Sequence, residues 1–578
     1  MFLELPKRLF ASSLRRFIHH QPRRMRYISL KNAVVDRVMA PDELKIQLTE
    51  TEEKICVLLD KCKEYLQAEK GISTTCRIAG GWVRDKLLGS QSNDLDIALS
   101  DIMGLAFAEH LAEFAKSQNI EVGTISKIAQ NPDQSKHLET ATFKMFGLEI
   151  DLVNLRSEEY ASNSRIPTGV TFGTPVQDAL RRDMTINALF YNVHTRTVED
   201  FTGKGLDDLR NGIIRTPLPP RETFLDDPLR IIRCIRFASR FGFQFVPELE
   251  NAVKDPTIQE ALVLKVARER AGMELTKMMK GRDPVHAVSL IQDLSLFDPI
   301  FSVIPTDIVS TFSRPRSAKI DSLKATSILR LLLSDTSTGL TPLHPLLTTA
   351  IHEDTTCKDR LYLAATLTPY LGVTYKDKKQ REFPAVTYII RESLKLGTQN
   401  HYLDGIPALF AASEILKNPD LNQEKYRQSS ERVIIGLMLR EKAVHNANTG
   451  SHWTSSLLFS LLQELIPCCE TIEEGLKVSA ASEKITIYNR FVERVEELAL
   501  TSAMDAKPLV DGREVVSLLN VKAGPWTGTV LARVVEWQLE HPEGSKGECL
   551  TWLKEQLSAG TLGIDQNGPV SKKARIYR

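Results

Sequence analysis

The sequence predicts an α/β (α+β) head with a small mixed sheet, followed by an all-α C-terminal portion. Two observations indicate this fold class. Between about residues 77 and 153, short apolar runs of strand length alternate with a helical pattern and with glycine turns. After about residue 285, apolar residues recur at helical spacing, with breaks rich in Pro, Ser and Thr near residues 305–315 and 334–345. We therefore expect a sheet-containing first part and a helical remainder.

Length, charge and cysteine spacing exclude several classes of protein. A chain of 578 residues accommodates several domains, and its 74 basic and 73 acidic residues leave a net charge of +1. Any nucleic-acid binding must therefore use local basic surfaces. The eight cysteines show no spacing typical of a zinc site, so we expect reduced and mostly buried thiols. No apolar run reaches the length of about eighteen residues that a membrane span needs.

The first 35 residues differ from the rest of the chain. They contain eight Lys or Arg residues against one acid, Glu4, with large apolar residues interleaved. This pattern is typical of a mitochondrial presequence, and the alternative is a basic arm that contacts RNA. Met25 offers a second start that would bypass most of the presequence and give a cytoplasmic or nuclear form.

The head begins with a strand, a tight turn and a helix. Residues 77–79 form a short apolar run that stops at Gly80 and Gly81, and helical spacing follows from Val83. Glycines in such a turn allow backbone N–H groups to approach an anion closely, and the first turn of a helix adds further N–H donors. We expect Gly80, Gly81, Arg84 and Asp85 to bind the phosphates of a nucleotide. The alternative is a plain turn, with Arg84 and Asp85 as an exposed helical pair.

The next strand carries two carboxylates on one face. Asp94 and Asp96 alternate with the apolar residues Leu95 and Ile97, so both acids leave the same side of the strand. Carboxylate oxygens suit Mg²⁺, and a pair of them indicates a two-metal site with Asp94 and Asp96 as catalytic metal ligands. Asp151, in an apolar run over 148–153, is either a third carboxylate of this site or part of an exposed edge.

The chain then continues through a loop into a second group of phosphate-binding candidates. Residues 158–174 are polar and rich in Gly, Pro and Ser, which predicts a flexible loop beside the site. Residues 178–190 have helical spacing that places Asp183 and Asn187 on one face. Arg181 and Arg182 suit phosphate contact, because a guanidinium matches the geometry of phosphate oxygens.

A predicted helix after residue 226 carries candidates for base recognition. Asp227 suits the N-cap and Pro228 the first helical position, and Arg230 and Arg233 share a face one turn later. A carboxylate only accepts hydrogen bonds and a guanidinium only donates them. Cytosine and adenine each offer an amine next to a ring nitrogen, so Asp227 and Arg230 would select CTP and ATP over UTP and GTP. The alternative is that Asp227 only caps the helix.

Near the C-terminus, a Gly-Pro turn opens another predicted helix. Arg513, Lys522 and Gly524 could hold an RNA phosphate there, through positive charge and backbone N–H groups. The alternative is a turn between packed helices.

The order and spacing of these motifs, from about Ile78 to Arg270, resemble those of the CCA-adding tRNA nucleotidyltransferases, in the class shared by bacteria and eukaryotes and in its fungal branch. That family's base-reading motif often begins with Glu, where this chain has Asp226.

The resemblance implies an order of domains and a set of partners. We expect a presequence over residues 1–35, a nucleotidyltransferase head over 40–215, a helical neck over 216–285, a helical body over 286–480 and a tRNA-binding tail over 481–578. The implied partners are CTP, ATP and tRNA, the last bound at its 3′ end and its acceptor and elbow region, and neither DNA nor a membrane. A poly(A) polymerase of the same superfamily and a catalytically silent RNA-binding module are the rival interpretations.

Overall fold

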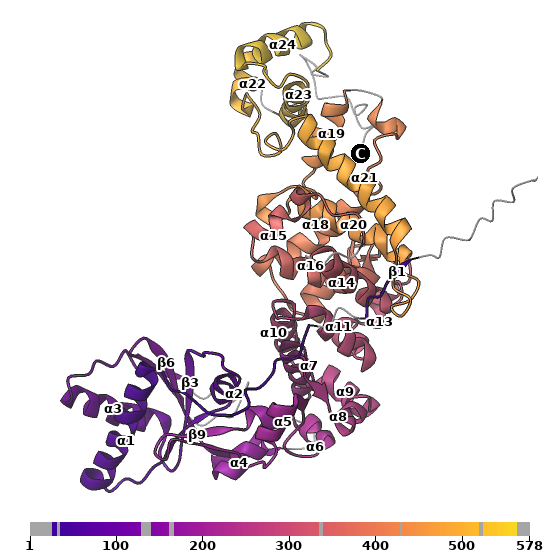
Figure 1. The fold of residues 1–578 in the computed structure, drawn as a ribbon. Helices are drawn as coiled ribbons and strands as arrows, with labels where there is room; N and C mark the ends of the chain where they lie inside the picture. Colours follow the sequence, from indigo (N-terminus) through magenta and orange to yellow (C-terminus); the bar gives the residue numbers. More distant parts are fainter. Residues whose placement is uncertain are drawn as a thin grey trace, which may run out of the picture.

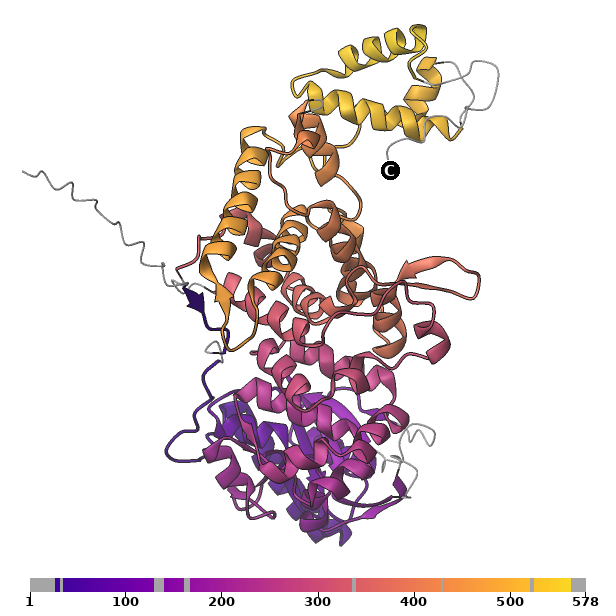
Figure 2. The ribbon, with the colours of Figure 1, turned by 90° about the vertical axis from the view of Figure 1, so that its right-hand side faces the viewer.

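The computed structural model describes residues 26–31, 35–128, 140–160, 167–334, 339–427, 430–519 and 524–562. The molecule is bent. The head forms one arm, and the helical parts form a column that ends in the tail (Figure 1). The view turned by 90° shows the same column above the head (Figure 2). Most of the predicted presequence, residues 1–25, lies outside the described residues.

The head is built on a mixed sheet whose described strands run in the order β10-β9-β2-β3-β6-β5-β4. Neighbouring strands are antiparallel except for β3 and β6, which are parallel. The head elements are α1 (Glu50–Lys70), β2 (Cys76–Ala79), α2 (Gly81–Leu87), β3 (Asp94–Leu99), α3 (Gly104–Ser117), β4 (Ser126–Ile128), β5 (Thr140–Met145), β6 (Leu148–Asn154), β7 (Arg156–Tyr160), β8 (Pro167–Phe172), α4 (Pro175–Leu180), a 3-10 turn (Thr185–Asn187), β9 (Phe190–Asn192), β10 (Thr197–Glu199) and α5 (Gly205–Asn211). The predicted strand–turn–helix–strand order around Gly80 is confirmed.

The neck and body are mainly helical. The neck contains β11 (Ile213–Ile214), α6 (Pro220–Asp226), α7 (Leu229–Phe241), β12 (Gln244–Phe245), α8 (Pro247–Val253), α9 (Pro256–Lys265) and α10 (Arg268–Met279). The body contains α11 (Pro284–Asp293), α12 (Phe297–Phe301), α13 (Thr306–Val309), α14 (Ile320–Leu332), α15 (Thr349–Glu353), α16 (Cys357–Thr366), β13 (Thr374–Lys376), β14 (Glu382–Pro384), α17 (Ala385–Tyr388), α18 (Tyr402–Ile415), α19 (Glu431–Leu439), α20 (Trp453–Leu465) and β15 (Leu476–Lys477).

The helix α21 (Val478–Glu497) leads from the body towards the tail, whose helices are α22 (Gly512–Leu519), α23 (Trp526–Glu540) and α24 (Lys546–Ser558). The tail has a hydrophobic cluster of its own, which includes Val515, Val530 and Leu553. The head, neck and body share one continuous cluster. The helical C-terminal portion is confirmed, with short strand pairs added to it.

One of these pairs joins the N-terminal end of the described chain to the last strand of the body. The strand β1 (Tyr27–Ile28) pairs antiparallel with β15, so Tyr27 lies opposite Lys477 and Ile28 opposite Leu476. The boundary expected at residue 35 therefore falls inside a segment that packs on the body.

Two local predictions are wrong. The flexible loop expected over residues 158–174 contains the end of β7 and all of β8, which pair antiparallel, and its residues 161–166 lie outside the described residues. The helix expected over 178–190 ends at Leu180, and Met184 is extended. The helix stops because Asp183 accepts a hydrogen bond from the backbone N of Met184 at 2.9 Å, a local bond that competes with the helical pattern.

The prediction of mostly buried cysteines is confirmed. All eight cysteines are free, and seven of them are buried. The described helices include none that is both long and apolar enough to cross a bilayer.

Candidate active site

The strand β3 presents its two carboxylates as predicted. Leu95 and Ile97 are buried, whereas Asp94 and Asp96 reach solvent from the opposite face. Asp96 reaches solvent, but desolvation by the surrounding protein still raises its pKa. The positive charge of Arg182 opposes this rise, and the negative charges of Asp151 and Asp94 add to it. Asp151 lies at the same level as Asp96 on the parallel strand β6, and it accepts a hydrogen bond from the hydroxyl of Thr142 at 2.5 Å.

This arrangement fits a metal ion that takes part of its ligands from a substrate. In the described part of the chain, no group of three His, Cys, Asp or Glu residues is close enough to hold a metal by itself. Mg²⁺ commonly uses one or two protein carboxylates and completes its shell with phosphate oxygens and water. A carboxylate pair that faces solvent beside an arginine meets this requirement.

The glycine turn lies against Arg182. Gly80 adopts φ 72° and ψ −123°, a conformation that side chains disfavour, and a Cβ atom at this position would lie 2.8 Å from an Nη atom of Arg182. Arg182 also donates to the backbone O of Asn187 at 3.1 Å and lies over the ring of Phe190. The absence of a side chain at Gly80 therefore lets the guanidinium approach the turn.

Asp178 organises the two neighbouring arginines. One of its carboxylate oxygens accepts from Arg181, and the other accepts from Nε of Arg182 at 3.1 Å and from an Nη at 2.9 Å. Burial alone would raise the pKa of Asp178, but Arg182 and Arg181 outweigh burial and hold the pKa below its ordinary value. Asp178 was not among the predicted site residues, although its spacing of three and four residues from the two arginines is a signal for such contacts.

Arg84 and Asp85 lie inside the protein rather than on an exposed helical face. Arg84 is 3% exposed, donates to Asp85 at 2.8 Å and to the side-chain oxygen of Asn187, and packs on the ring of Phe237. Burial lowers the pKa of Arg84 to about 10, although Asp85 opposes the shift. Arg240 of α7 donates to the second oxygen of Asp85 at 3.1 Å. The helix after the glycine turn is thus bound to the neck.

A second link joins the head to α7. Asp183 accepts from the side chain of Asn187 at 3.1 Å and from Nε of Arg233 at 2.8 Å. Asp183 and Asn187 are therefore neighbours as predicted, through a turn instead of a helix. The carboxylate of Asp183 in turn raises the pKa of Arg233.

Asp227 and Arg230 lie at the start of α7. Asp227 accepts from the backbone N of Leu229 at 3.1 Å and from Arg270 at 3.2 Å. Arg230 is 8% exposed and donates to the backbone O atoms of Thr223 at 3.3 Å and Arg181 at 2.6 Å. These bonds fix the orientation of both groups. A guanidinium has five N–H donors and each carboxylate oxygen accepts more than one bond, so the side chains keep the capacity to bind a base.

The tail candidates are only partly described. Arg513 is exposed near the start of α22, and Gly524 precedes α23, which begins at Trp526 as the Gly-Pro turn predicts. Lys522 lies outside the described residues.

Comparisons with known proteins decide the family. Residues 76–215 match a family model described as the Poly A polymerase head domain. The chain is 38% identical to "CCA tRNA nucleotidyltransferase, mitochondrial" of Saccharomyces cerevisiae, over 89% of this chain and 94% of the relative. It is 34% identical to "tRNA nucleotidyltransferase cca2" of Schizosaccharomyces pombe, over 88% of this chain and 99% of the relative. The chain belongs to the CCA tRNA nucleotidyltransferase family.

The fold of this CCA tRNA nucleotidyltransferase is similar to that of solved structures. A CCA-adding enzyme solved in complex with ATP aligns with a TM-score of 0.56 at 19% identity, over 90% of this chain and 96% of that chain. The predicted head with a small mixed sheet and a helical C-terminal portion is thereby confirmed. The prediction of a nucleotidyltransferase is confirmed by the relatives named above.

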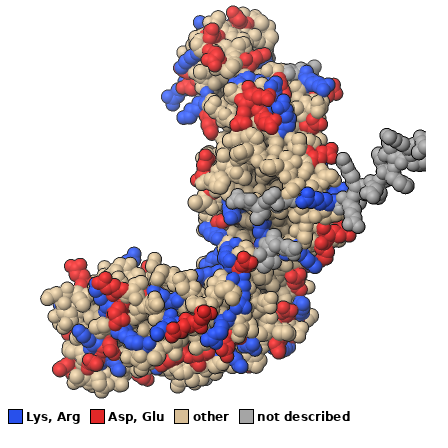
Figure 3. All heavy atoms as spheres, in the orientation of Figure 1, with Lys and Arg blue, Asp and Glu red and all other residues tan. Residues whose placement is uncertain are grey.

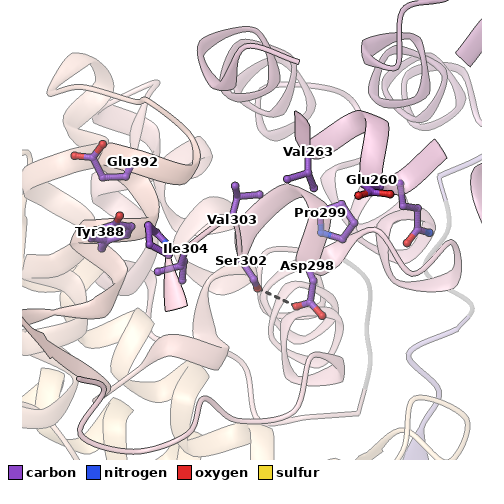
Figure 4. Close-up of a pocket in the computed structure, with 11 residues that line it drawn as sticks. Glu260, Val263, Asp298, Pro299, Ser302, Val303, Ile304, Tyr388 and Glu392 are labelled. Atoms are coloured by element: carbon purple, nitrogen blue, oxygen red, sulfur yellow. Dashed lines mark hydrogen bonds between the residues drawn. The ribbon is translucent and has the colours of Figure 1, made fainter. Parts of the chain in front are cut away.

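A separate groove lies between neck and body, lined by residues of α9, α12, the adjoining loop and the turn that follows α17 (Figure 4). The close-up shows Asp298 bonded to Ser302, and Asp298 also accepts from Arg316 at 2.9 Å. None of the candidate site residues lines this groove.

Proposed function

We propose that this enzyme adds C, C and A to the 3′ end of tRNA without a nucleic-acid template, using CTP and ATP and releasing pyrophosphate. The observation that carries the proposal is that Arg182 lies between the glycine turn and the carboxylates of β3. Its guanidinium lies against the Gly80 turn, and its charge acts on the carboxylate of Asp96. The chain matches relatives that are named as tRNA nucleotidyltransferases, and the match covers nearly their whole length. These relatives support tRNA as the acceptor.

Asp94 and Asp96 would hold divalent metal, which we propose to be two Mg²⁺ ions. When bound, such ions lower the pKa of an attacking hydroxyl and neutralise charge on a departing pyrophosphate. The exposed carboxylate pair supports this assignment, since it leaves room for phosphate oxygens to complete the coordination.

The remaining residues of the head would position the reactants. Gly80 and Gly81 would let the backbone approach the triphosphate, and Arg181 and Arg182, oriented by Asp178, would bind its oxygens. The tRNA 3′-hydroxyl would then attack the α-phosphate, forming the new P–O bond as the bond to pyrophosphate breaks. Positioning of this kind is a major source of rate enhancement in phosphoryl transfer.

Five further side chains complete the proposed nucleotide site. Asp183 and Asn187 would contact the sugar and phosphates, with Arg233 fixing Asp183 from the neck. Arg84 and Asp85 would act through Asn187, since Arg84 is buried and bonded to it.

Base choice would depend on Asp227 and Arg230. The carboxylate would accept from the exocyclic amine of cytosine or adenine, and the guanidinium would donate to the adjacent ring nitrogen. The bond from Arg270 to Asp227 and the two backbone bonds of Arg230 hold both groups in place. UTP and GTP would place a carbonyl oxygen against the carboxylate, leaving buried polar groups mismatched.

Basic surfaces support tRNA binding along the inner side of the bend. Lys and Arg side chains gather where α7 and α10 meet the head (Figure 3). We propose that the tRNA 3′ end enters there, and that Arg513, Lys522 and Gly524 of the tail contact its backbone further from the 3′ end.

The relative from Saccharomyces cerevisiae is named as mitochondrial, which supports a mitochondrial location for this chain. We propose that residues before Arg26 direct import, and that a start at Met25 would give cytoplasmic and nuclear forms.

The decisive experiment is incubation of the protein with tRNA that lacks its last three nucleotides, with products resolved to one base. We expect two added nucleotides with CTP alone and three with CTP and ATP together. Long tails with ATP alone would indicate a poly(A) polymerase. No incorporation of either nucleotide would indicate an RNA-binding module.

A further inference from the structure

An N-terminal strap connects the body, the neck and the head. We define the strap as residues 26–31 and 35–48, which run from β1 along the neck to the start of α1 (Figures 1 and 2). On the body, β1 pairs with β15, and on the neck the backbone N of Val38 donates to the O of Phe241 at 2.8 Å. On the head, Lys86 donates to the O of Gln47 at 3.4 Å.

The strap residue with the most specific contacts is Arg37. Its guanidinium donates to the backbone O of Asn211 at 2.5 Å and to that of Arg210 at 2.7 Å. These two carbonyls belong to the last turn of α5, where backbone oxygens lack helical partners and where the helix dipole favours a positive charge. Arg37 therefore caps α5 from a segment 174 residues earlier in the chain.

Arg37 is also wedged between two glycines. Gly212 ends α5 with φ 70°, and a Cβ atom there would lie 2.7 Å from Cδ of Arg37. Gly242 ends α7 with φ 69°, and a Cβ atom there would lie 2.9 Å from Cα of Arg37. Both positions require glycine for their backbone conformation and also for the close approach of the strap. The residue thus fixes the ends of two helices relative to each other.

These two helices hold opposite sides of the nucleotide site. Asp208 of α5 accepts from the hydroxyl of Thr185 at 2.7 Å, which anchors the turn that contains Asn187. The other helix, α7, carries Arg230 and Arg233, and Arg233 reaches Asp183 beside that turn. A shift of α7 against α5 would change the distance between the triphosphate-binding and base-reading groups.

We infer that Arg37 is a positioning residue for the nucleotide site, acting through the ends of α5 and α7. The inference rests on the proposed function, because it assigns the two sides of the site to binding one nucleotide. It also implies that the part of the strap that contains Arg37 belongs to the working enzyme, so that a presequence must end before Arg37.

The test compares Arg37→Ala and Arg37→Lys with the control Asp36→Ala. Asp36 directly precedes Arg37 in the strap, and its side chain is exposed. We expect Arg37→Ala to raise KM for CTP and ATP by about tenfold with kcat changed less than about twofold, because saturating nucleotide restores the geometry. Arg37→Lys should recover part of the loss, since an ammonium reaches one carbonyl where the guanidinium reaches two. Asp36→Ala should match wild type.

Hydrogen exchange gives a readout that does not depend on catalysis. In Arg37→Ala, the backbone N–H of Val38 and that of Gln244, which donates to Gly212, should exchange faster than in wild type.

An unchanged KM in Arg37→Ala, or an equal increase in Asp36→Ala, would overturn the inference. A fall in kcat alone, with KM unchanged, would also overturn it, because that result is expected of a smaller folded fraction. If wild type itself incorporates neither CTP nor ATP, the proposed function fails, while the exchange measurement still reports whether Arg37 links α5 to α7.

Discussion

Arg233 of the neck helix α7 donates from Nε to Oδ2 of Asp183 in the head at 2.8 Å. Burial alone would raise the pKa of Asp183, but Arg233, the hydrogen bond from Asn187 and the charge of Arg230 hold that pKa below its ordinary value. This ion pair joins the two parts of the protein that form the proposed nucleotide site.

Asp183→Asn should therefore destabilise the protein by about 2 kcal/mol at neutral pH, because it removes a charged hydrogen-bond partner and keeps the side-chain oxygen that caps Met184. A lowered pKa in the folded state stabilises the fold above the ordinary pKa of about 3.9 and loses that contribution as the pH falls through the lowered value. The difference between wild type and variant should be constant from pH 7 to about pH 5 and shrink below pH 4. Urea unfolding across this range measures it.

Asp207→Asn is the control, because its ion pair with Arg210 on α5 is exposed. Its effect should stay below about 0.5 kcal/mol at every pH. A difference for Asp183→Asn that grew on acidification would contradict the assigned direction of the pKa shift.

Asp94→Ala and Asp96→Ala should each abolish incorporation of both CTP and ATP and leave tRNA binding largely intact. The reason is that both carboxylates leave the same exposed face of β3 and would hold the metal. Gel-resolved incorporation measures the loss, and filter binding measures tRNA affinity. Glu109→Ala, on the exposed surface of α3, should behave as wild type. Normal turnover in either aspartate variant would remove that residue from the metal site.

Gly80→Ala should weaken nucleotide binding by at least tenfold. A Cβ atom would meet the guanidinium of Arg182 at 2.8 Å, and alanine disfavours φ 72°. Gly89→Ala is a matched control, since φ there is 77° and no atom lies within 4 Å of the added Cβ. Both variants should lose about 1 kcal/mol of stability, and only Gly80→Ala should raise KM. Equal KM values in the two variants would show that the contact with Arg182 does not matter.

Arg230→Ala should lose discrimination against UTP and GTP, or lose activity, because the base would no longer meet a donor beside Asp227. Asp227→Ala should have a similar effect, with the bond from Arg270 also removed. Single-nucleotide incorporation with each of the four triphosphates measures selectivity. Arg221→Ala changes an exposed arginine of the neighbouring helix α6 and should leave selectivity unchanged. Unaltered selectivity in Arg230→Ala would exclude it from base reading.

In the tail, Arg513→Ala and Lys522→Ala should raise KM for tRNA and leave KM for CTP and ATP unchanged. In a plot of the logarithm of the tRNA binding constant against the logarithm of the salt concentration, each lost phosphate contact should reduce the size of the slope by about one. Arg533→Ala is the control, since Arg533 pairs with Glu536 on α23. A salt dependence equal to that of wild type would place both residues outside the tRNA interface.

Much of the head was predictable because its signals are local. A period of two residues places Asp94 and Asp96 on one face of a strand, and the glycine pair ends one strand and begins a helix. The helix over residues 178–190 was predicted wrongly for an equally physical reason. Its apolar spacing was helical, but the helix ends at Leu180, and Asp183 bonds locally to the backbone N of Met184.

The sequence by itself determined which groups are available to a site: the order of the strand, turn and helix in the head, the carboxylate pair, the candidate base-reading side chains and the helical C-terminal portion. The tertiary structure decided which of these groups meet. In the folded chain, Arg84 bonds to Asn187, which lies 103 residues away in the sequence, and Arg37 lies between the ends of α5 and α7. Local periodicity reports only which face of an element is buried, whereas contacts between distant segments depend on how those faces pack against one another.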